Sequence, residues 1–405
     1  MVVTLAATAV SDDSTKVHRL EVEVVPGLIL HTNEFLKGLN PEVRTMNHSF
    51  TAKLKYAFMP PEGSLQAQSY KGVYQGAGMA IHDLNPQLGH PLSVFLFQGA
   101  TIATLSKQLV LNYEWNLGLT YGWKNFDTEE RPENRVIGSR TTANIDLDLY
   151  LRWTLSRHWD LNVGAAFTHY SNGNTSIPNA GLNVMGAKVS VAYFWGRQEE
   201  GGRSKETGGR SKEEGGRSKE TGDRKQETGG GRQEEGGTHH WVWDLTVYGA
   251  WKQKGVEMSD GIHALPGTYG VAGFHLNPLY RLNRWLNVGP SLDGAYDWSA
   301  NLDIDNSVFS REIKVVQEAD VIPAPWHRQV GLGLSARGEF VMPYFTINFG
   351  IGHHFVNGRT GDLKGFYEIL ALKIHVLRQA YLHIGYSLYD FAYPNNLLLG
   401  LGVHL

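Results

Sequence analysis

The chain has 405 residues, with 37 basic and 40 acidic side chains, 47 glycines and no cysteine. The near balance of charge argues against a basic surface for nucleic acid, and the lack of cysteine excludes disulfides and thiolate metal ligands. Glycine makes up roughly 12% of the chain (47 of 405) against about 7% in ordinary proteins, and aromatic residues make up 11%. This composition favours one large β-barrel over two or three soluble domains.

Residues 1–16 begin with the small, apolar run MVVTLAATAV and lack the basic start of a complete signal peptide. We expect the remnant of a signal peptide or a flexible N-terminus here, and a disordered cytosolic start is the alternative. No apolar run reaches about 18 residues anywhere in the chain, so the sequence predicts no membrane-spanning helix.

Residues 17–196 alternate apolar and polar side chains with a period of two, which is typical of strands with one apolar face. In 109–123, LVLNYEWNLGLTYGW, every odd position is apolar or aromatic and most even positions are polar or glycine. In 144–153, NIDLDLYLRW, the odd positions are again apolar while Asp146 and Asp148 occupy the other face.

Residues 161–195 form a predicted hairpin whose apolar face ends in polar residues. The odd positions of the first strand are apolar from Leu161 to Phe167 and continue into His169 and Ser171. The odd positions of the second strand are apolar and begin with Asn183. These three polar side chains are therefore predicted to project outward together, at the outer end of one hairpin.

Residues 197–238 repeat GGRSKET with a period of seven, and the segment from Arg197 to Gly237 holds 10 basic and 10 acidic residues. A coiled coil needs apolar a and d positions, and the repeat has none. We expect a disordered, periplasmic insert. From 239 to 405 the alternation returns, for example in LLLGLGVHL at 397–405.

The alternating runs are about 9 to 15 residues long, which suits tilted membrane-crossing strands better than the five or six residues usual in soluble sandwiches. The sequence therefore predicts an all-β fold: one transmembrane antiparallel outer-membrane β-barrel of about 16 strands, its wall built from 17–196 and 239–405. Because 70–84 is the weakest strand, 12 or 14 strands remain open. Long links should lie outside, and both termini and the insert in the periplasm.

A nucleophile, a base and an orienting group are available on the outward face of the hairpin. Residues i and i+2 of a strand lie about 6.6 Å apart on one face. If Ser171 lies opposite Asn183, then Asn183 is diagonal to His169 at about 7 to 8 Å. Ser171 would attack an ester carbonyl, His169 would take its proton, and Asn183 would fix the tautomer of the ring.

The residues after Ser171 supply candidates for an oxyanion hole, namely the side chain or backbone of Asn172, the N–H of Gly173 and the amide of Asn179. The alternative is that this cluster of Ser, Asn, Gly and Pro only builds a loop. Polar groups in a lipid-facing band are costly, however, and usually functional.

The stretch FTHYSNGNTSIPNAGLN at 167–183 resembles the signature of the lipid A 3-O-deacylase (PagL-like) family of outer-membrane barrels. That signature has a His-x-Ser-Asn motif, a Pro-Asn step and an acidic residue fourteen positions after the histidine. The resemblance implies that His169 is the base and Ser171 the nucleophile. It also implies that Asn172 and Asn179 contribute to the oxyanion hole.

Asn183 departs from the family pattern, because those enzymes have glutamate at this place. An amide can orient a histidine but supplies no charge to stabilise the imidazolium. The resemblance covers only 161–195, and members of the family are barrels of about eight strands. The chain therefore looks like an enlarged relative, of the kind called acyloxyacyl hydrolases.

Two functions remain open from the sequence. The first is an outer-membrane serine esterase that removes an ester-linked acyl chain from the lipid A of lipopolysaccharide in the outer leaflet, without a metal or other cofactor, and with a homodimer possible. The second is a channel or transporter for small or hydrophobic solutes, because about 16 strands leave room for a pore.

Other candidate residues carry weaker signals. The pairs at 239–240 and 353–354 are adjacent histidines, which point to opposite faces of a strand and so cannot chelate one metal together. Arg131, Arg135 and Arg140 lie in a predicted outer loop, where contact with lipid phosphates is one reading and a solvated loop the other.

Overall fold

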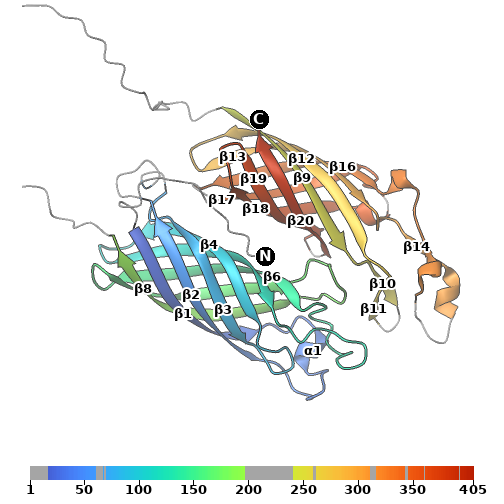
Figure 1. Cartoon of the computed structure of the whole chain (residues 1–405), viewed down its shortest axis with the longest axis horizontal. Helices are drawn as coiled ribbons and strands as arrows, with labels where there is room; N and C mark the ends of the chain where they lie inside the picture. Colours follow the sequence, from blue (N-terminus) through green and yellow to red (C-terminus); the bar gives the residue numbers. More distant parts are fainter. Residues whose placement is uncertain are drawn as a thin grey trace, which may run out of the picture.

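The computed structural model of the protein describes residues 17–60, 67, 70–196, 240–258, 261–310, 316–342, 345–359, 361–391 and 393–405. Within these residues the chain forms two closed antiparallel β-barrels of eight strands each, one from each half of the sequence (Figure 1). The predicted N-terminal segment 1–16, the charged repeat at 197–238 and His239 lie outside the described residues.

The first barrel closes because β1 pairs with β2 on one side and with β8 on the other. Its strands are β1 (Val17–Ile29), β2 (His48–Met59), β3 (Tyr74–Asp83), β4 (Leu92–Thr104), β5 (Leu109–Tyr121), β6 (Thr141–Thr154), β7 (Trp159–Ser171) and β8 (Leu182–Trp195). The segment predicted to be the weakest strand, 70–84, does contain β3.

The second barrel closes in the same way, because β9 pairs with both β12 and β20. Its strands are β9 (Trp241–Lys252), β12 (Tyr269–Arg281), β13 (Leu286–Asp297), β16 (Val330–Val341), β17 (Phe345–Val356), β18 (Phe366–His375), β19 (Ala380–Tyr389) and β20 (Tyr393–His404). Its loops contain β10 (Gly255–Met258), β11 (Gly261–Ala264), β14 (Asp303–Ile304), β15 (Val321–Ile322), η2 (Asn306–Ser310), η3 (Glu318–Asp320), η4 (Trp326–Arg328) and η5 (Gly361–Leu363).

The all-β class, the antiparallel pairing and the total of 16 barrel strands are confirmed, but the prediction of a single wall is wrong. One 16-stranded barrel would need β8 to pair with β9 and β1 with β20. Instead β1 pairs with β8 and β9 pairs with β20. Alternation along each strand sets which side chains face in and out, but it does not specify which strands meet to close the wall.

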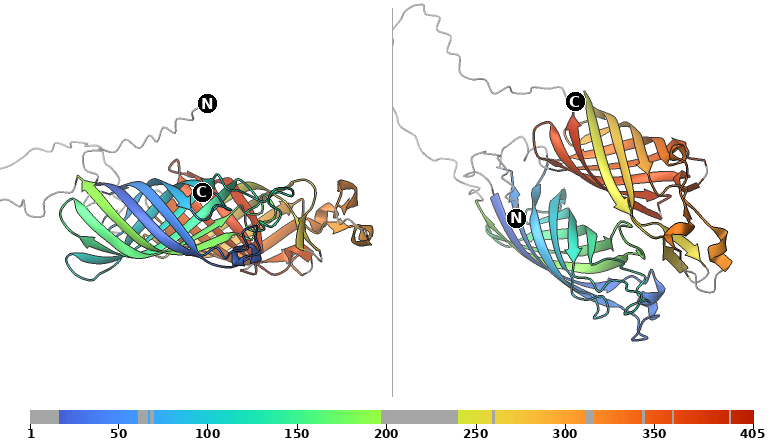
Figure 2. Two further views of the ribbon diagram at one scale, coloured as in Figure 1. Left: turned by 90° about the horizontal axis from the view of Figure 1, so that it is seen from below. Right: turned by 45° about the vertical axis from the view of Figure 1, so that its right-hand side comes forward.

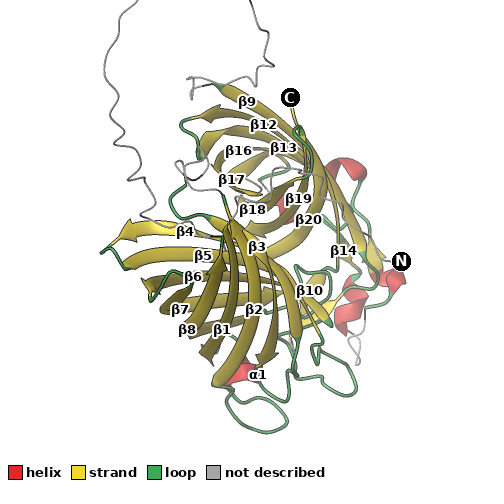
Figure 3. Cartoon of the chain, turned by 60° about the vertical axis from the view of Figure 1, so that its left-hand side comes forward, coloured by secondary structure: helices red, strands yellow, loops and turns green. Residues whose placement is uncertain are grey.

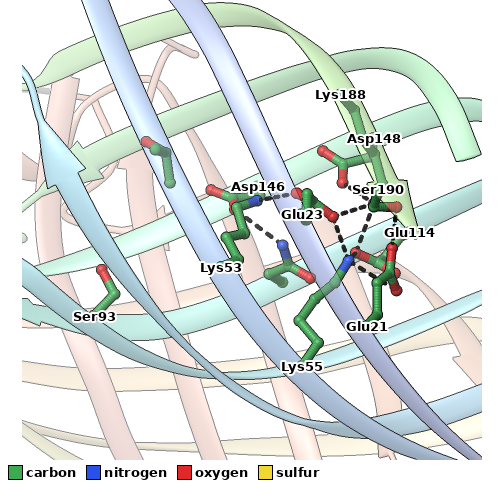
Figure 4. Close-up of polar contacts among 12 residues, drawn as sticks. Glu21, Glu23, Lys53, Lys55, Ser93, Glu114, Asp146, Asp148, Lys188 and Ser190 are labelled. Atoms are coloured by element: carbon green, nitrogen blue, oxygen red, sulfur yellow. Dashed lines mark hydrogen bonds and ion pairs between the residues drawn. The ribbon is translucent and has the colours of Figure 1, made fainter. Parts of the chain in front are cut away.

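The interior of the first barrel explains why eight strands are enough. Charged side chains from facing walls meet inside it, and all of them are buried. Figure 4 shows Glu21, Glu23, Lys53, Lys55, Glu114, Asp146, Asp148 and Lys188. Arg19 joins them through its ion pair with Glu21. Lys53 on β2, for example, reaches Asp146 on β6 across the barrel at 2.8 Å. Such pairs can form only where opposite walls are close, so the polar face of the alternating pattern becomes a filled core and not a channel.

The interior of the second barrel is filled by a smaller network. Asp293 accepts hydrogen bonds from Arg337, His275 and Tyr367, at 2.7, 2.8 and 2.7 Å. Lys373 lies between Asp244 and Glu339. Both barrels therefore have a buried, ion-paired interior and an apolar exterior, as the two-residue alternation predicts.

The links at 30–47, 84–91, 122–140 and 172–181 lie at one end of the first barrel, and the links that contain β10, β11, β14 and β15 lie at one end of the second. The two barrels lie side by side with these ends pointing the same way (Figures 1 and 2). In the first barrel the short helix α1 (Glu34–Lys37) lies in the link between β1 and β2. At this end a cluster of buried apolar residues closes the mouth of the barrel: Ile29, Phe35, Leu36, Met46, Leu84, Leu88, Trp123, Val136, Ile137, Tyr170, Leu182 and Val184.

The outer surfaces of the two barrels contact each other. Trp115 on β5 packs against Phe345 on β17, with ring centroids 6.0 Å apart, and Leu372 on β18 completes a buried cluster. Figure 3 shows that strands make up almost all of both walls and that the helical segments lie in the links. In the described part of the chain no helix is long and apolar enough to cross a membrane.

Candidate functional site

The hairpin of β7 and β8 carries the predicted site at its outer end. His169 and Asn183 are directly opposite each other across the two strands. Alternate residues of β7 are buried, from Asp160 to Tyr170, while Val163 and other odd positions are exposed. His169, Ser171 and Asn183 share this outward parity, as predicted.

The predicted register is off by one pair. Asn183 lies opposite His169 and not opposite Ser171, which extends beyond the β8 ladder and pairs with Ala143 on the other side. The reason is the link from 172 to 181, which leaves β7 after Ser171 and rejoins β8 only at Leu182. This direct pairing brings the Asn183 amide closer to the His169 ring than the predicted diagonal placement would.

The histidine is held in one orientation by the asparagine. His169 Nδ1 lies 2.7 Å from Asn183 Oδ1. Because an amide oxygen only accepts hydrogen bonds, this contact requires the proton on Nδ1 and leaves the lone pair on Nε2. A histidine with a free Nε2 lone pair is prepared to accept a proton from a hydroxyl.

Two hydrogen-bond donors point at the hydroxyl oxygen of Ser171. Its Oγ accepts hydrogen bonds from Asn179 Nδ2 at 3.0 Å and from the backbone N–H of Gly173 at 3.2 Å. Among the contacts of the described residues no hydrogen bond joins Ser171 directly to His169. Catalytic hydrogen bonds of this kind often tighten only when substrate binds, so the shared face and the i, i+2 spacing are the relevant geometry.

The predicted oxyanion-hole residues divide into two groups. Asn179 and Gly173 direct donors at the serine oxygen, as described above. The Asn172 side chain turns away and donates to the Ser176 carbonyl at 2.8 Å, while the Asn172 N–H donates to Asn179 Oδ1 at 3.1 Å. Asn172 therefore builds the loop that positions Asn179.

The inner side of the hairpin holds the site rigid. Tyr170, between His169 and Ser171, points inward and bonds His82 at 3.0 Å. Gly181 has a φ of +73°, and a Cβ there would lie 3.0 Å from His169 Cε1. The backbone at this position must therefore be glycine both for its left-handed conformation and for the space that the imidazole occupies.

The second barrel covers the serine, which the sequence did not predict. Ser171 is only 6% exposed although it has outward parity. Asn174 Nδ2 donates to the Pro394 carbonyl at 2.5 Å, and the Gln253 N–H donates to the Asn174 carbonyl at 2.8 Å. A Cβ on Gly173 would lie 2.6 Å from Leu397. No periodicity in the sequence reports such contacts between residues that are 79 to 224 positions apart.

A group of three carboxylates inside the first barrel has the composition of a metal site, namely Glu23, Glu114 and Asp148. The ammonium of Lys188 already lies among them, at 2.9, 3.0 and 2.7 Å respectively. Because this cation neutralises the same oxygens that an ion would use, the cluster fits a structural ion network and not a metal centre.

The other sequence candidates do not join the site. Arg131 donates to the Asn125 carbonyl and to Glu130 within its own loop, and Arg140 is exposed. Arg135 reaches the second barrel, where it donates to the Ile262 carbonyl at 3.4 Å. His353 is exposed and His354 is buried, so the adjacent pair does face opposite sides as predicted.

Two family profiles cover most of the chain, and they divide it as the barrels do. The family described as lipid A 3-O-deacylase (PagL) matches residues 49–192, and the acyloxyacyl hydrolase C-terminal domain matches 241–405. The chain belongs to the lipid A 3-O-deacylase family. Membership places it among the outer-membrane lipid A deacylases, which are hydrolases, and locates it in the bacterial outer membrane, as the sequence predicts.

Some solved structures have a limited likeness to the chain. Neisserial surface protein A is 9% identical and covers 44% of this chain and 94% of its own, with a TM-score of 0.27. The N-terminal β-barrel domain of Pseudomonas aeruginosa OprF is 9% identical and covers 44% and 97%, with a TM-score of 0.26. The strand pairing itself defines the architecture. No curated protein matches the chain.

Proposed function

We propose that the first barrel hydrolyses an ester-linked acyl chain of lipid A in the outer leaflet, with Ser171 as nucleophile, His169 as base and Asn183 as the group that orients the histidine. The observation that carries this proposal is the 2.7 Å contact between His169 Nδ1 and Asn183 Oδ1, on the outward face that also bears Ser171. This contact leaves Nε2 free to accept the proton.

The reaction has two balanced halves. In the first, Ser171 Oγ forms a bond to the ester carbonyl carbon and its proton passes to His169 Nε2. The tetrahedral intermediate then expels the sugar alkoxide, which takes that proton and leaves as an alcohol. In the second half, a water gives its proton to His169 and attacks the acyl-serine, and the fatty acid leaves while Ser171 recovers its proton.

Asn179 and the Gly173 N–H supply the first stabilisation of charge. Both already donate to Ser171 Oγ, and the negative oxygen of the intermediate is attached to the carbon that Oγ attacks. Donors fixed before the reaction need little reorganisation when charge develops, which makes this kind of contribution large. Asn183 supplies orientation without charge, so the imidazolium is stabilised less than it would be by a carboxylate.

The outward face below the site provides a path for the acyl chain. Leu147 and Leu149 on β6 are 60% and 51% exposed on the face that leads to Ile145, the residue opposite His169. An acyl chain of a lipid can lie along this apolar wall while its ester reaches the polar residues at the outer end. Lateral diffusion in the bilayer then delivers the substrate, which accounts for a catalytic set outside the barrel. The association of two copies of the chain into a homodimer stays a prediction.

A channel was the alternative function because a single wall of about 16 strands would leave room for a pore. Barrels of eight strands have interiors that side chains can fill, and both interiors here contain buried ion-paired networks.

Mass spectrometry of lipid A from cells that produce the protein tests the proposal. We expect wild-type protein to remove an acyl chain and Ser171→Ala to leave lipid A as in cells with an empty vector. Ser387→Ala changes a serine of the second barrel and is expected to retain activity. Identical lipid A from wild type, Ser171→Ala and empty vector would overturn the proposal.

A further inference from the structure

We infer that the second barrel completes the active site by supplying Tyr386, whose hydroxyl donates a hydrogen bond to the negative oxygen that forms during acyl transfer. The inference rests on the proposed function of Ser171 and assigns a catalytic residue from the other half of the chain, more than 200 positions away.

Tyr386 is placed at the serine by the outward face of β19. A Cβ on Gly173 would lie 3.3 Å from Tyr386 Cε2, so the ring packs against the loop that follows Ser171. Gly173 follows Ser171 by two residues and its N–H donates to Ser171 Oγ, so the ring lies beside the serine. These contacts cross from the second barrel to the first.

The hydroxyl is available for a further hydrogen bond. It is buried, yet among the described residues it has no partner at good hydrogen-bond geometry. A buried donor without a good partner costs free energy and is rare in folded proteins, unless the site has a use for it. Here the unused donor lies beside the only serine that the proposed reaction needs.

The chemistry of the intermediate gives this donor its role. When Ser171 Oγ bonds to the ester carbonyl carbon, the carbonyl π electrons move to the oxygen, which becomes negative. That oxygen is attached to the same carbon as Oγ, so a donor beside Oγ is close to the place where charge develops. Asn179 and Gly173 approach from the loop, and Tyr386 approaches from the second barrel.

The docking of the two barrels holds Tyr386 in position. The Ile177 N–H donates to Gln253 Oε1 at 2.8 Å, and the Asn174 side chain donates to the Pro394 carbonyl. Both bonds join the loop after Ser171 to the second barrel, at β20 and directly after β9, the next strands along the wall from β19. The loop, the serine and the tyrosine are thus fixed to one another.

The test uses the full chain and measures fatty acid release from lipid A in detergent micelles. Tyr386→Phe keeps the ring and removes only the hydroxyl. We expect kcat to fall roughly ten- to hundredfold with little change in KM, since oxyanion donors act mainly in the transition state. Labelling of Ser171 by a fluorophosphonate should slow similarly, because its phosphoryl oxygen occupies the same place. Tyr381→Phe, on the same strand but facing inward, is the matched control and should leave both rates unchanged.

Each outcome decides the inference. A kcat for Tyr386→Phe within twofold of wild type would overturn it while leaving Ser171 as nucleophile. If Ser171→Ala is as active as wild type, the proposed function fails instead. If Tyr386→Phe does not fold, as judged by heat-dependent gel mobility, Gln253→Ala decides: a several-fold loss of kcat supports completion of the site by the second barrel, and an unchanged kcat contradicts it.

Discussion

The corresponding hairpins of the two barrels differ in one respect that decides their roles. In β7–β8 a Tyr-Ser pair, Tyr170–Ser171, is followed by Pro178–Asn179. In β19–β20 Tyr386–Ser387 is followed by Pro394–Asn395, with the same spacing of seven from Ser to Pro (178 − 171 and 394 − 387). The second barrel thus carries a partial copy of the motif.

In this partial copy the tyrosine and the serine have exchanged faces of the strand. In the first barrel the tyrosine points inward and the serine outward, whereas Tyr386 lies toward Ser171 and Ser387 lines the interior of the second barrel. A shift of one residue on a strand exchanges its two faces. The partial copy also lacks the histidine and the asparagine. Gly385 stands where the first barrel has His169, and Leu399 stands where it has Asn183. Similar residues can therefore belong to the proposed catalytic set in one barrel and cover that set in the other.

The largest expected effect tests whether only one barrel is catalytic. His169→Asn removes the proposed base, and we expect kcat for deacylation to fall by about 10³, within the range usual for loss of a general base. Fatty acid release measures this effect. His383→Asn on β19 is the comparison and should keep near wild-type activity; an equal loss in both variants would contradict the assignment of catalysis to the first barrel.

The second effect concerns the stability of the two interiors. Lys188 neutralises three buried carboxylates, whereas Lys373 neutralises two, Asp244 and Glu339. Lys188→Met should lower the free energy of unfolding by roughly 3 to 5 kcal/mol, since it leaves buried charge uncompensated. Lys373→Met should cost less. Urea unfolding in lipid vesicles measures both, and a larger cost for Lys373→Met would refute this ranking.

The third effect concerns the missing charge beside the histidine. Asn183→Glu places a carboxylate at His169 Nδ1, and we expect kcat to rise about tenfold, because a hydrogen bond to an ionised acceptor is roughly twice as strong as a neutral one. Asn183→Leu copies the residue of the second barrel and should lower kcat. Steady-state kinetics measure kcat for both variants. If kcat does not rise for Asn183→Glu, residue 183 contributes only by orienting the histidine.

The smallest effect separates backbone strain from crowding of the histidine. Gly181→Ala strains a backbone with a φ of +73° and also crowds the His169 ring, so we expect roughly a threefold loss of kcat. Gly267→Ala strains a φ of +88° with nothing within 4 Å of the added Cβ. It should cost ~1 kcal/mol of stability and no activity. Equal activity of the two variants would show that Gly181 serves only the turn.

The sequence by itself determined the local features of this protein. The period of two fixed which side chains face out, because successive residues of a strand point to opposite faces, and so it placed His169, Ser171 and Asn183 on one outward surface. The total of about 16 barrel strands followed from the same alternation, and the motif at 167–183 carried the resemblance to the family.

Only the tertiary structure decided how the strands close and what covers the site. Closure depends on which edges pair and on charges that meet across a narrow interior, as Lys53 and Asp146 do, and a repeating pattern is the same for one wall or two. The register of Asn183 depended on where the loop rejoins β8. The place of Tyr386 depended on the docking of one barrel on another, and contacts between distant segments leave no periodic signal in the chain.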